Sequence, residues 1–237
     1  MVSALVIAVE IISALLTIIL FHSTLKPCRA SSISYLLGIP AGFGLMAIAS
    51  AMNVVSLGLA SSVPGMGLII GIIQLLTGTY GLLFIALTYA RRTRLKFIGA
   101  STSVELAIPS LVTVTVLICT ILWGGSSSPN SVPENVEFML RSVMAIAALY
   151  LVYETERNWS LTKRGSEGVV VIGFALLFVE QIGFMLAAWN FRDVATFLGY
   201  EGRILGLIIL NAVTHASLKA GDTSRVLKRL GLVAPAH

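Results

Sequence analysis

Seven runs of apolar residues, each close to the length that crosses a lipid bilayer, dominate this sequence. A hydrocarbon core of about 30 Å needs about 20 helical residues. The chain is 57% hydrophobic and only 11% charged, whereas soluble domains carry about 25% charged residues. We therefore expect an all-α integral membrane protein in which residues 1–237 form a single seven-helix transmembrane domain, with no soluble domain. The predicted spans are 2–21, 33–59, 65–90, 101–123, 139–155, 168–189 and 203–220.

The basic residues predict how the bundle is oriented. If the N-terminus lies outside, 13 of the 16 Lys and Arg residues fall in cytoplasmic segments. Only Arg141, Arg192 and Arg203 then fall on the outer side. Short cytoplasmic loops carry an excess of Lys and Arg. We expect a multi-pass protein of the cell membrane with its N-terminus outside and its C-terminus in the cytoplasm.

Charge and motifs limit the class of function. The net charge of +5 comes from residues in short loops between apolar runs, where membrane topology places them, so we expect no nucleic-acid partner. The sequence lacks the G-x-S-x-G, H-E-x-x-H and P-loop motifs, and we expect no enzymatic activity. The expected partners are the lipid bilayer, a small-molecule ligand or solute, and either a second copy of the chain or a partner membrane subunit.

The chain contains a candidate internal repeat. A shift of 137 residues aligns the first three helices with the last three and leaves the fourth as a linker. Asn53 then coincides with Asn190, Gln74 with Asn211, and Thr77 with Thr214. An odd linker helix would make the triplets parallel, in a 3+1+3 arrangement known in transporters. The alternative is chance alignment of apolar helices of similar length.

Five polar side chains are predicted to lie at one depth, roughly 9–14 Å below the outer surface at about 1.5 Å of rise per residue. Such groups are costly in lipid and mark functional sites. They predict a ligand or solute cavity in the outer half, between helices one, two, three, six and seven. The alternative for the amides is interhelical hydrogen bonding. The five residues are Glu10, Asn53, Gln74, Glu180, which is followed by Gln181, and Asn211.

The two carboxyl groups are the predicted chemical centre of this cavity. No Lys or Arg is expected at the depth of Glu10 and Glu180, so we expect neutral acids or acids that face water. His22 and His215 are candidate ligands of a haem or metal. They lie on the first and last predicted helices, which are often neighbours in a seven-helix bundle. A shared haem or metal is conceivable there. A rim histidine and a core histidine explain them more simply, and we expect no cofactor and no metal.

Two families share the predicted architecture. The order of seven helices with an outside N-terminus is similar to that of microbial rhodopsins, which hold retinal on a lysine in the middle of the last helix. Residues 204–215 contain no lysine, and Lys219 is too near the cytoplasmic end. The 3+1+3 arrangement resembles the small sugar facilitators with PQ-loop repeats, but the chain has no Pro-Gln pair and Pro40 has no counterpart in the second triplet. Both resemblances stop at architecture.

Two functions of different classes are compatible with these patterns. The first is a transporter-like or receptor-like protein that handles a small solute or ligand through the outer polar cavity. The second is a non-catalytic or haem-carrying subunit or scaffold of a larger membrane complex. The first predicts a hydrated cavity, and the second predicts a filled bundle whose polar groups bond to one another.

Overall fold

A computed structural model describes residues 4–31, 34–59, 66–94, 111, 114, 115, 118, 132–163, 165–188, 192–219 and 230. These residues are helical apart from turns, as predicted, and six helices are long and apolar enough to cross a membrane. The predicted span 101–123 lies outside the described residues except for four isolated positions. The helices are α1 (Ala4–Ala30), α2 (Gly38–Leu59), α3 (Met66–Arg94), α5 (Glu134–Thr162), α6 (Gly165–Ala188) and α7 (Arg192–Lys219), with a 3-10 turn η1 (Ser34–Leu37) before α2.

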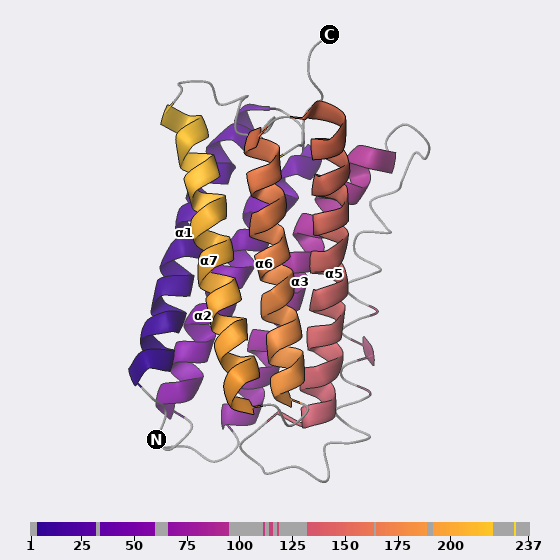
Figure 1. Cartoon of the computed structure of the whole chain (residues 1–237). Helices are drawn as coiled ribbons and strands as arrows, with labels where there is room; N and C mark the ends of the chain where they lie inside the picture. The colour runs from indigo at the N-terminus through magenta and orange to yellow at the C-terminus, as the bar shows by residue number, and fades with distance from the viewer. Residues whose placement is uncertain are drawn as a thin grey trace.

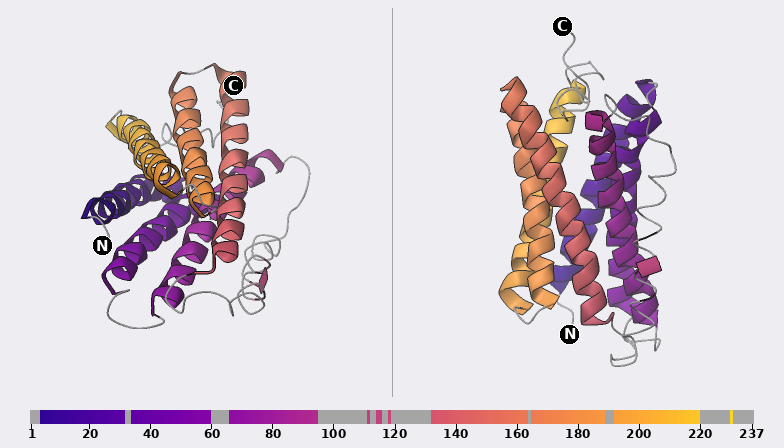
Figure 2. Two further views of the ribbon diagram at one scale, coloured as in Figure 1. Left: turned by 60° about the horizontal axis from the view of Figure 1, so that its bottom comes forward. Right: turned by 90° about the vertical axis from the view of Figure 1, so that its right-hand side faces the viewer.

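The six helices form a closed ring. Each packs against the next one in the chain, α3 packs against α5, and α7 returns to pack against α1. Figure 1 shows that α1, α3, α5 and α7 run in one direction and that α2 and α6 run in the other. In the right-hand view of Figure 2, α5, α6 and α7 lie on one side and α2 and α3 on the other.

The outer surface of the ring is apolar, as lipid requires. Large aliphatic side chains are exposed on every helix, while many Ser and Thr side chains are buried and bond to the carbonyl one turn earlier, as Thr79 does to Leu75. A soluble protein rarely exposes so much contiguous apolar surface. The chain is therefore a multi-pass helical membrane bundle. Representative exposed residues are Leu15 on α1, Ile48 on α2, Ile69 on α3, Ile146 on α5, Ile172 on α6 and Phe197 on α7.

Three helices extend beyond the predicted spans, and two of these extensions change the site. Helix α1 continues to Ala30, beyond the predicted end at residue 21. Helix α5 spans Glu134–Thr162 where 139–155 was predicted, and α7 begins at Arg192 where 203 was predicted. The predicted spans begin at or near Arg141 and Arg203, but an arginine that faces the bundle interior does not mark the end of a helix. Arg141 and Arg203 therefore lie inside the bundle, not in outer loops.

Glycines set the spacing of two helix pairs. A Cβ on Gly42 of α2 would lie 2.5 Å from the Gly81 carbonyl oxygen of α3. A Cβ on Gly206 of α7 would lie 2.9 Å from the Gly173 carbonyl oxygen of α6. Both distances are too short for any side chain, so these backbones touch directly. Small residues allow this close approach in membrane bundles.

An apolar cluster packs towards one end of the bundle, beside buried polar residues such as Thr24, Glu154 and Glu167. At the end where α1 finishes, Tyr89 of α3 packs edge-on against Phe174 of α6, with ring centroids 5.9 Å apart. The Tyr89 hydroxyl donates a 2.6 Å hydrogen bond to the carbonyl of Leu230, which is itself buried. Leu36 and Leu151 belong to the same apolar cluster. The polar cluster lies towards the opposite end.

Candidate solute-binding cavity

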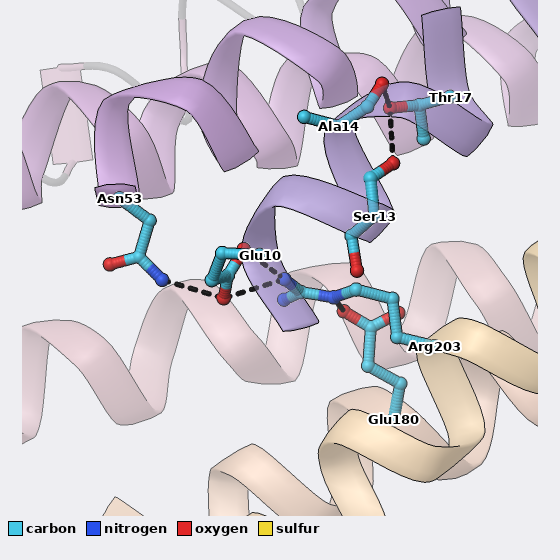
Figure 3. Close-up of polar contacts among 7 residues, drawn as sticks. All are labelled: Glu10, Ser13, Ala14, Thr17, Asn53, Glu180 and Arg203. Atoms are coloured by element: carbon cyan, nitrogen blue, oxygen red, sulfur yellow. Dashed lines mark hydrogen bonds and ion pairs between the residues drawn. The ribbon is translucent and has the colours of Figure 1, made fainter. Parts of the chain in front are cut away.

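An arginine shared by two carboxylates is the centre of the polar cluster. Arg203 Nη1 on α7 lies 2.9 and 2.8 Å from the two carboxylate oxygens of Glu10 on α1. Its Nε donates a 2.7 Å hydrogen bond to Glu180 Oε1 on α6. Glu10 is 0% exposed, Glu180 2% and Arg203 8%. Figure 3 shows the guanidinium lying between the two acids. The arrangement is a buried ion-pair triad that ties α1 to both α6 and α7.

Neighbouring side chains complete the environment of this triad. The Asn53 amide on α2 donates a 2.6 Å hydrogen bond to Glu10 Oε1 (Figure 3). The Phe184 ring lies 5.1 Å from the centre of the Arg203 guanidinium, and Tyr200 packs edge-on against that ring. An aromatic face attracts a cation through its quadrupole. The charge of Arg203 is thus met by two carboxylates and two rings.

Arg141 is a second buried guanidinium with a much weaker set of partners. It projects from α5, is 7% exposed, and the centre of its guanidinium lies 4.5 Å from the centroid of the Phe184 ring. Its nearest carboxylate is Glu137, one turn earlier, with an Nε to Oε1 distance of 3.7 Å. That is too long for a hydrogen bond, and Arg141 Nε has no hydrogen-bond partner among the described residues. A buried cation in this state is suited to receive a ligand.

Two cavities adjoin this charge cluster. The inner cavity is about 40 Å³ in volume, and its polar lining residues are Thr17, Ser50, Gln74, Arg141, Glu180, Gln181 and Arg203. The outer cavity, which we call the vestibule, is about 630 Å³ and opens at the end of the bundle where α1 begins. Asn53, Ser56, Gln74, Glu134, Glu137, Arg141, Thr196 and Tyr200 are its polar lining residues. Gln74 and Arg141 line both cavities and therefore form the boundary between them.

The inner cavity contains hydrogen-bond acceptors that no described donor satisfies. Glu180 uses Oε1 to accept from Arg203, but its Oε2 has no partner, and neither has Gln181 Oε1. Buried polar atoms of this kind are normally hydrogen-bonded to protein, water or ligand. A space of 40 Å³ exceeds the roughly 10–15 Å³ that a water molecule needs. The cavity can therefore accept one or a few waters, or a small donor group.

The structure separates the five predicted site residues into lining and supporting groups. Glu180 lines the inner cavity, Asn53 lines the vestibule, and Gln74 lines both. Glu10 lines neither of these cavities but bonds directly to Arg203 and Asn53. Asn211 also lines neither cavity. Its side-chain amide donates a 3.0 Å hydrogen bond to the Leu16 carbonyl on α1. This is interhelical hydrogen bonding, the alternative role predicted for the amides.

The expectation that Glu10 and Glu180 lack a basic partner is wrong, because Arg203 bonds to both. The error follows from starting the last helix at residue 203. The predicted span 203–220 begins at Arg203 and so places this residue at the membrane rim, whereas α7 begins 11 residues earlier. The same error concealed Arg141, which the sequence placed two residues inside its helix. The sequence did contain one signal for this pairing. Two acids had no basic partner at their predicted depth, while two arginines lay near the predicted ends of their helices.

The two histidines lie outside this cluster. His22 and His215 are both exposed and line neither cavity. Among the residues that the structure describes, no group of three or more His, Cys, Asp or Glu side chains is placed to hold a metal ion.

Comparison of the chain with family models, with curated proteins and with solved structures gives no match.

Proposed function

We propose that this chain is a non-enzymatic carrier of the plasma membrane that moves a small polar solute through a cavity open to the outside. The main support is the combination of a buried charge cluster, a vestibule that reaches it from one end, and an apolar cluster around Tyr89 and Phe174 towards the other end. Ligand sites of carriers lie near the middle of the bilayer, where polar groups converge. A cavity closed on one side is the arrangement expected of one state of an alternating carrier.

We also propose seven spans with the N-terminus outside. Helices α3 and α5 run in the same direction (Figure 1), which supports one further crossing between them, where span 101–123 is predicted. Described basic residues gather at the end where α1 finishes, including Lys26, Arg29 and Arg157. That end is therefore assigned to the cytoplasm. Removing Arg141 and Arg203 from the outer loops makes the charge asymmetry larger.

The ring order supports the proposed repeat. If α1, α2 and α3 are paired with α5, α6 and α7, every helix contact in the ring maps onto another contact. The directions also agree within each pair (Figure 1). Carriers built from parallel repeats alternate by rocking one half against the other. The Arg203–Glu10 ion pair joins the two triplets, at the interface that such a motion would change.

A purely structural subunit is disfavoured by the same features. A scaffold gains stability when its polar groups bond to one another and leave no space. Here Arg141 Nε and Glu180 Oε2 have no hydrogen-bond partner among the described residues, and both residues line the inner cavity. Unsatisfied buried groups cost about 1–3 kcal/mol each, a cost that a binding function explains.

Uptake by purified protein in liposomes tests the carrier proposal. The experiment supplies a panel of radiolabelled amino acids, monocarboxylates, amines and sugars to vesicles with wild-type protein, with the Arg141→Gln variant, or with no protein. We expect at least one solute to accumulate with wild-type protein and to be reduced roughly tenfold or more with Arg141→Gln, because that change removes the loosely paired cation between the cavities. Folded wild-type protein that moves no solute in the panel would contradict the proposal.

A further inference from the structure

The charge balance of the cavities is informative about the ligand. Four carboxylates and two guanidiniums line the two cavities or bond directly to a lining residue: Glu10, Glu134, Glu137 and Glu180, with Arg141 and Arg203. Their formal charges leave a net charge of −2. A multiply charged anion such as phosphate would add to this negative excess in a poorly solvated site. A ligand that carries a positive group as well as a negative one matches the site better.

The acceptors identify where the positive group would bind. Glu180 Oε2 and Gln181 Oε1 both belong to residues that line the inner cavity, both residues are 2% exposed, and neither atom has a donor among the described residues. A primary ammonium group offers three N–H donors and no acceptor. It also fits a space of about 40 Å³, whereas a quaternary ammonium offers no donor and is several times bulkier.

Arg141 identifies where the negative group would bind. It lines both cavities, its Nε has no hydrogen bond, and its only described ion-pair partner is held at 3.7 Å. Glu137 has a side chain 35% exposed, so it can turn to solvent at little cost. A ligand carboxylate can then bind the planar guanidinium, the geometry in which arginine bonds strongest. The vestibule has space for the body of the ligand beside Leu57, Leu75 and Val132.

We propose that the solute is a small zwitterion with a primary ammonium and a carboxylate. The ammonium enters the inner cavity and donates to Glu180 and Gln181. The carboxylate binds Arg141 at the boundary, and an apolar body remains in the vestibule. This inference rests on the proposed carrier function and adds the chemical class of its solute.

Binding of matched probes to the full-length protein in lipid nanodiscs tests the inference. L-Valine carries both groups, isovalerate is the same compound without the amine, and isobutylamine is the same compound without the carboxylate. Glycine and γ-aminobutyrate vary the body and the spacing, and glycine betaine removes the N–H donors. We expect at least one primary-amine zwitterion to bind, measured by calorimetry and by the melting temperature. Its single-group analogues and betaine should bind at least tenfold more weakly.

Variants locate the binding site. Gln181→Met keeps the side-chain volume but removes the acceptor, and it should weaken the zwitterion roughly tenfold. Asn211→Met is the matched control, because it removes a buried amide that lines neither cavity, and it should leave affinity within twofold. Equal binding of isobutylamine, binding of betaine, or failure of glycine, L-valine and γ-aminobutyrate alike would overturn the inference. If a sugar or a monocarboxylate is taken up instead, the carrier proposal stands and the zwitterion inference is wrong. If the liposome panel is also negative, both are wrong.

Discussion

Arg203 supplies the counter-charge for two carboxylates that are buried away from water. Its guanidinium bonds to Glu10 and Glu180 through separate nitrogens. Breaking a buried ion pair by removing one partner typically costs about 3–5 kcal/mol, because the remaining charge is left uncompensated. The triad is therefore a structural requirement of this bundle as well as part of the cavity wall.

Replacing Arg203 should consequently be among the most damaging single changes. We expect Arg203→Gln to destabilise the protein by about 3–5 kcal/mol, seen as a large fall in the melting temperature in detergent. Adding Glu10→Gln to that variant should recover part of the loss, because it removes one uncompensated carboxylate. A double variant less stable than Arg203→Gln would show that the carboxylate of Glu10 is stabilised by something other than this arginine.

Asn211 separates helix packing from solute handling. Its amide joins α7 to the Leu16 carbonyl of α1 and faces neither cavity. Interhelical hydrogen bonds in membrane proteins contribute on average about 0.6 kcal/mol, so Asn211→Ala should lower the melting temperature slightly. Uptake per folded molecule should stay at the wild-type rate. A loss of uptake comparable with that of Arg141→Gln would place Asn211 in the site after all.

Depth along a helix can be read from the sequence, but the partner of a buried charge cannot. Glu10, Gln74 and Glu180 were predicted at a common depth, and the structure places them in or directly beside the cavities. Arg141 and Arg203 were assigned to outer rims because a strongly polar residue ends an apolar run. Whether such a residue ends the helix or points inward depends on the opposing helix, which a single sequence does not reveal.

At the scale of elements, the contact between α6 and α7 positions the triad. A Cβ on Gly202 would lie 2.8 Å from the Leu176 carbonyl oxygen and 3.0 Å from the Glu180 backbone nitrogen. The α7 backbone therefore touches α6 one residue before Arg203. This close approach is what lets the Arg203 Nε reach the Glu180 carboxylate at 2.7 Å.

Gly202→Ala should separate the two helices and weaken the triad. We expect a loss of about 1–3 kcal/mol, the usual cost of overpacking, together with reduced uptake. Gly165 on the same helix pair is a matched control, because a Cβ there would meet nothing within 4 Å. Gly165→Ala should leave both stability and uptake close to wild type. Equal melting temperatures for the two variants would argue against the positioning role of Gly202.

At the scale of the whole molecule, composition and periodic apolar runs were sufficient to predict an all-helical membrane bundle. The order of helices around the ring was not predictable, because every helix is apolar on its lipid face and lateral neighbours depend on small contacts such as Gly42 with Gly81. The cavities follow from that order. They form where polar side chains from neighbouring helices converge at one end, while the apolar cluster around Tyr89 and Phe174 packs towards the other end.

The central claim is that a water-filled vestibule opens to the outside and that the opposite end is closed. Single cysteines in a protein with Cys28 and Cys119 replaced by alanine test it in intact cells with a charged, membrane-impermeant thiol reagent. Ser56→Cys in the vestibule should react from outside. Ala148→Cys, buried in the packed interior, should not react. Glu156→Cys, exposed near the opposite end, should react only after the membrane is permeabilised. An unreactive Ser56→Cys, or a Glu156→Cys that reacts in intact cells, would contradict the account.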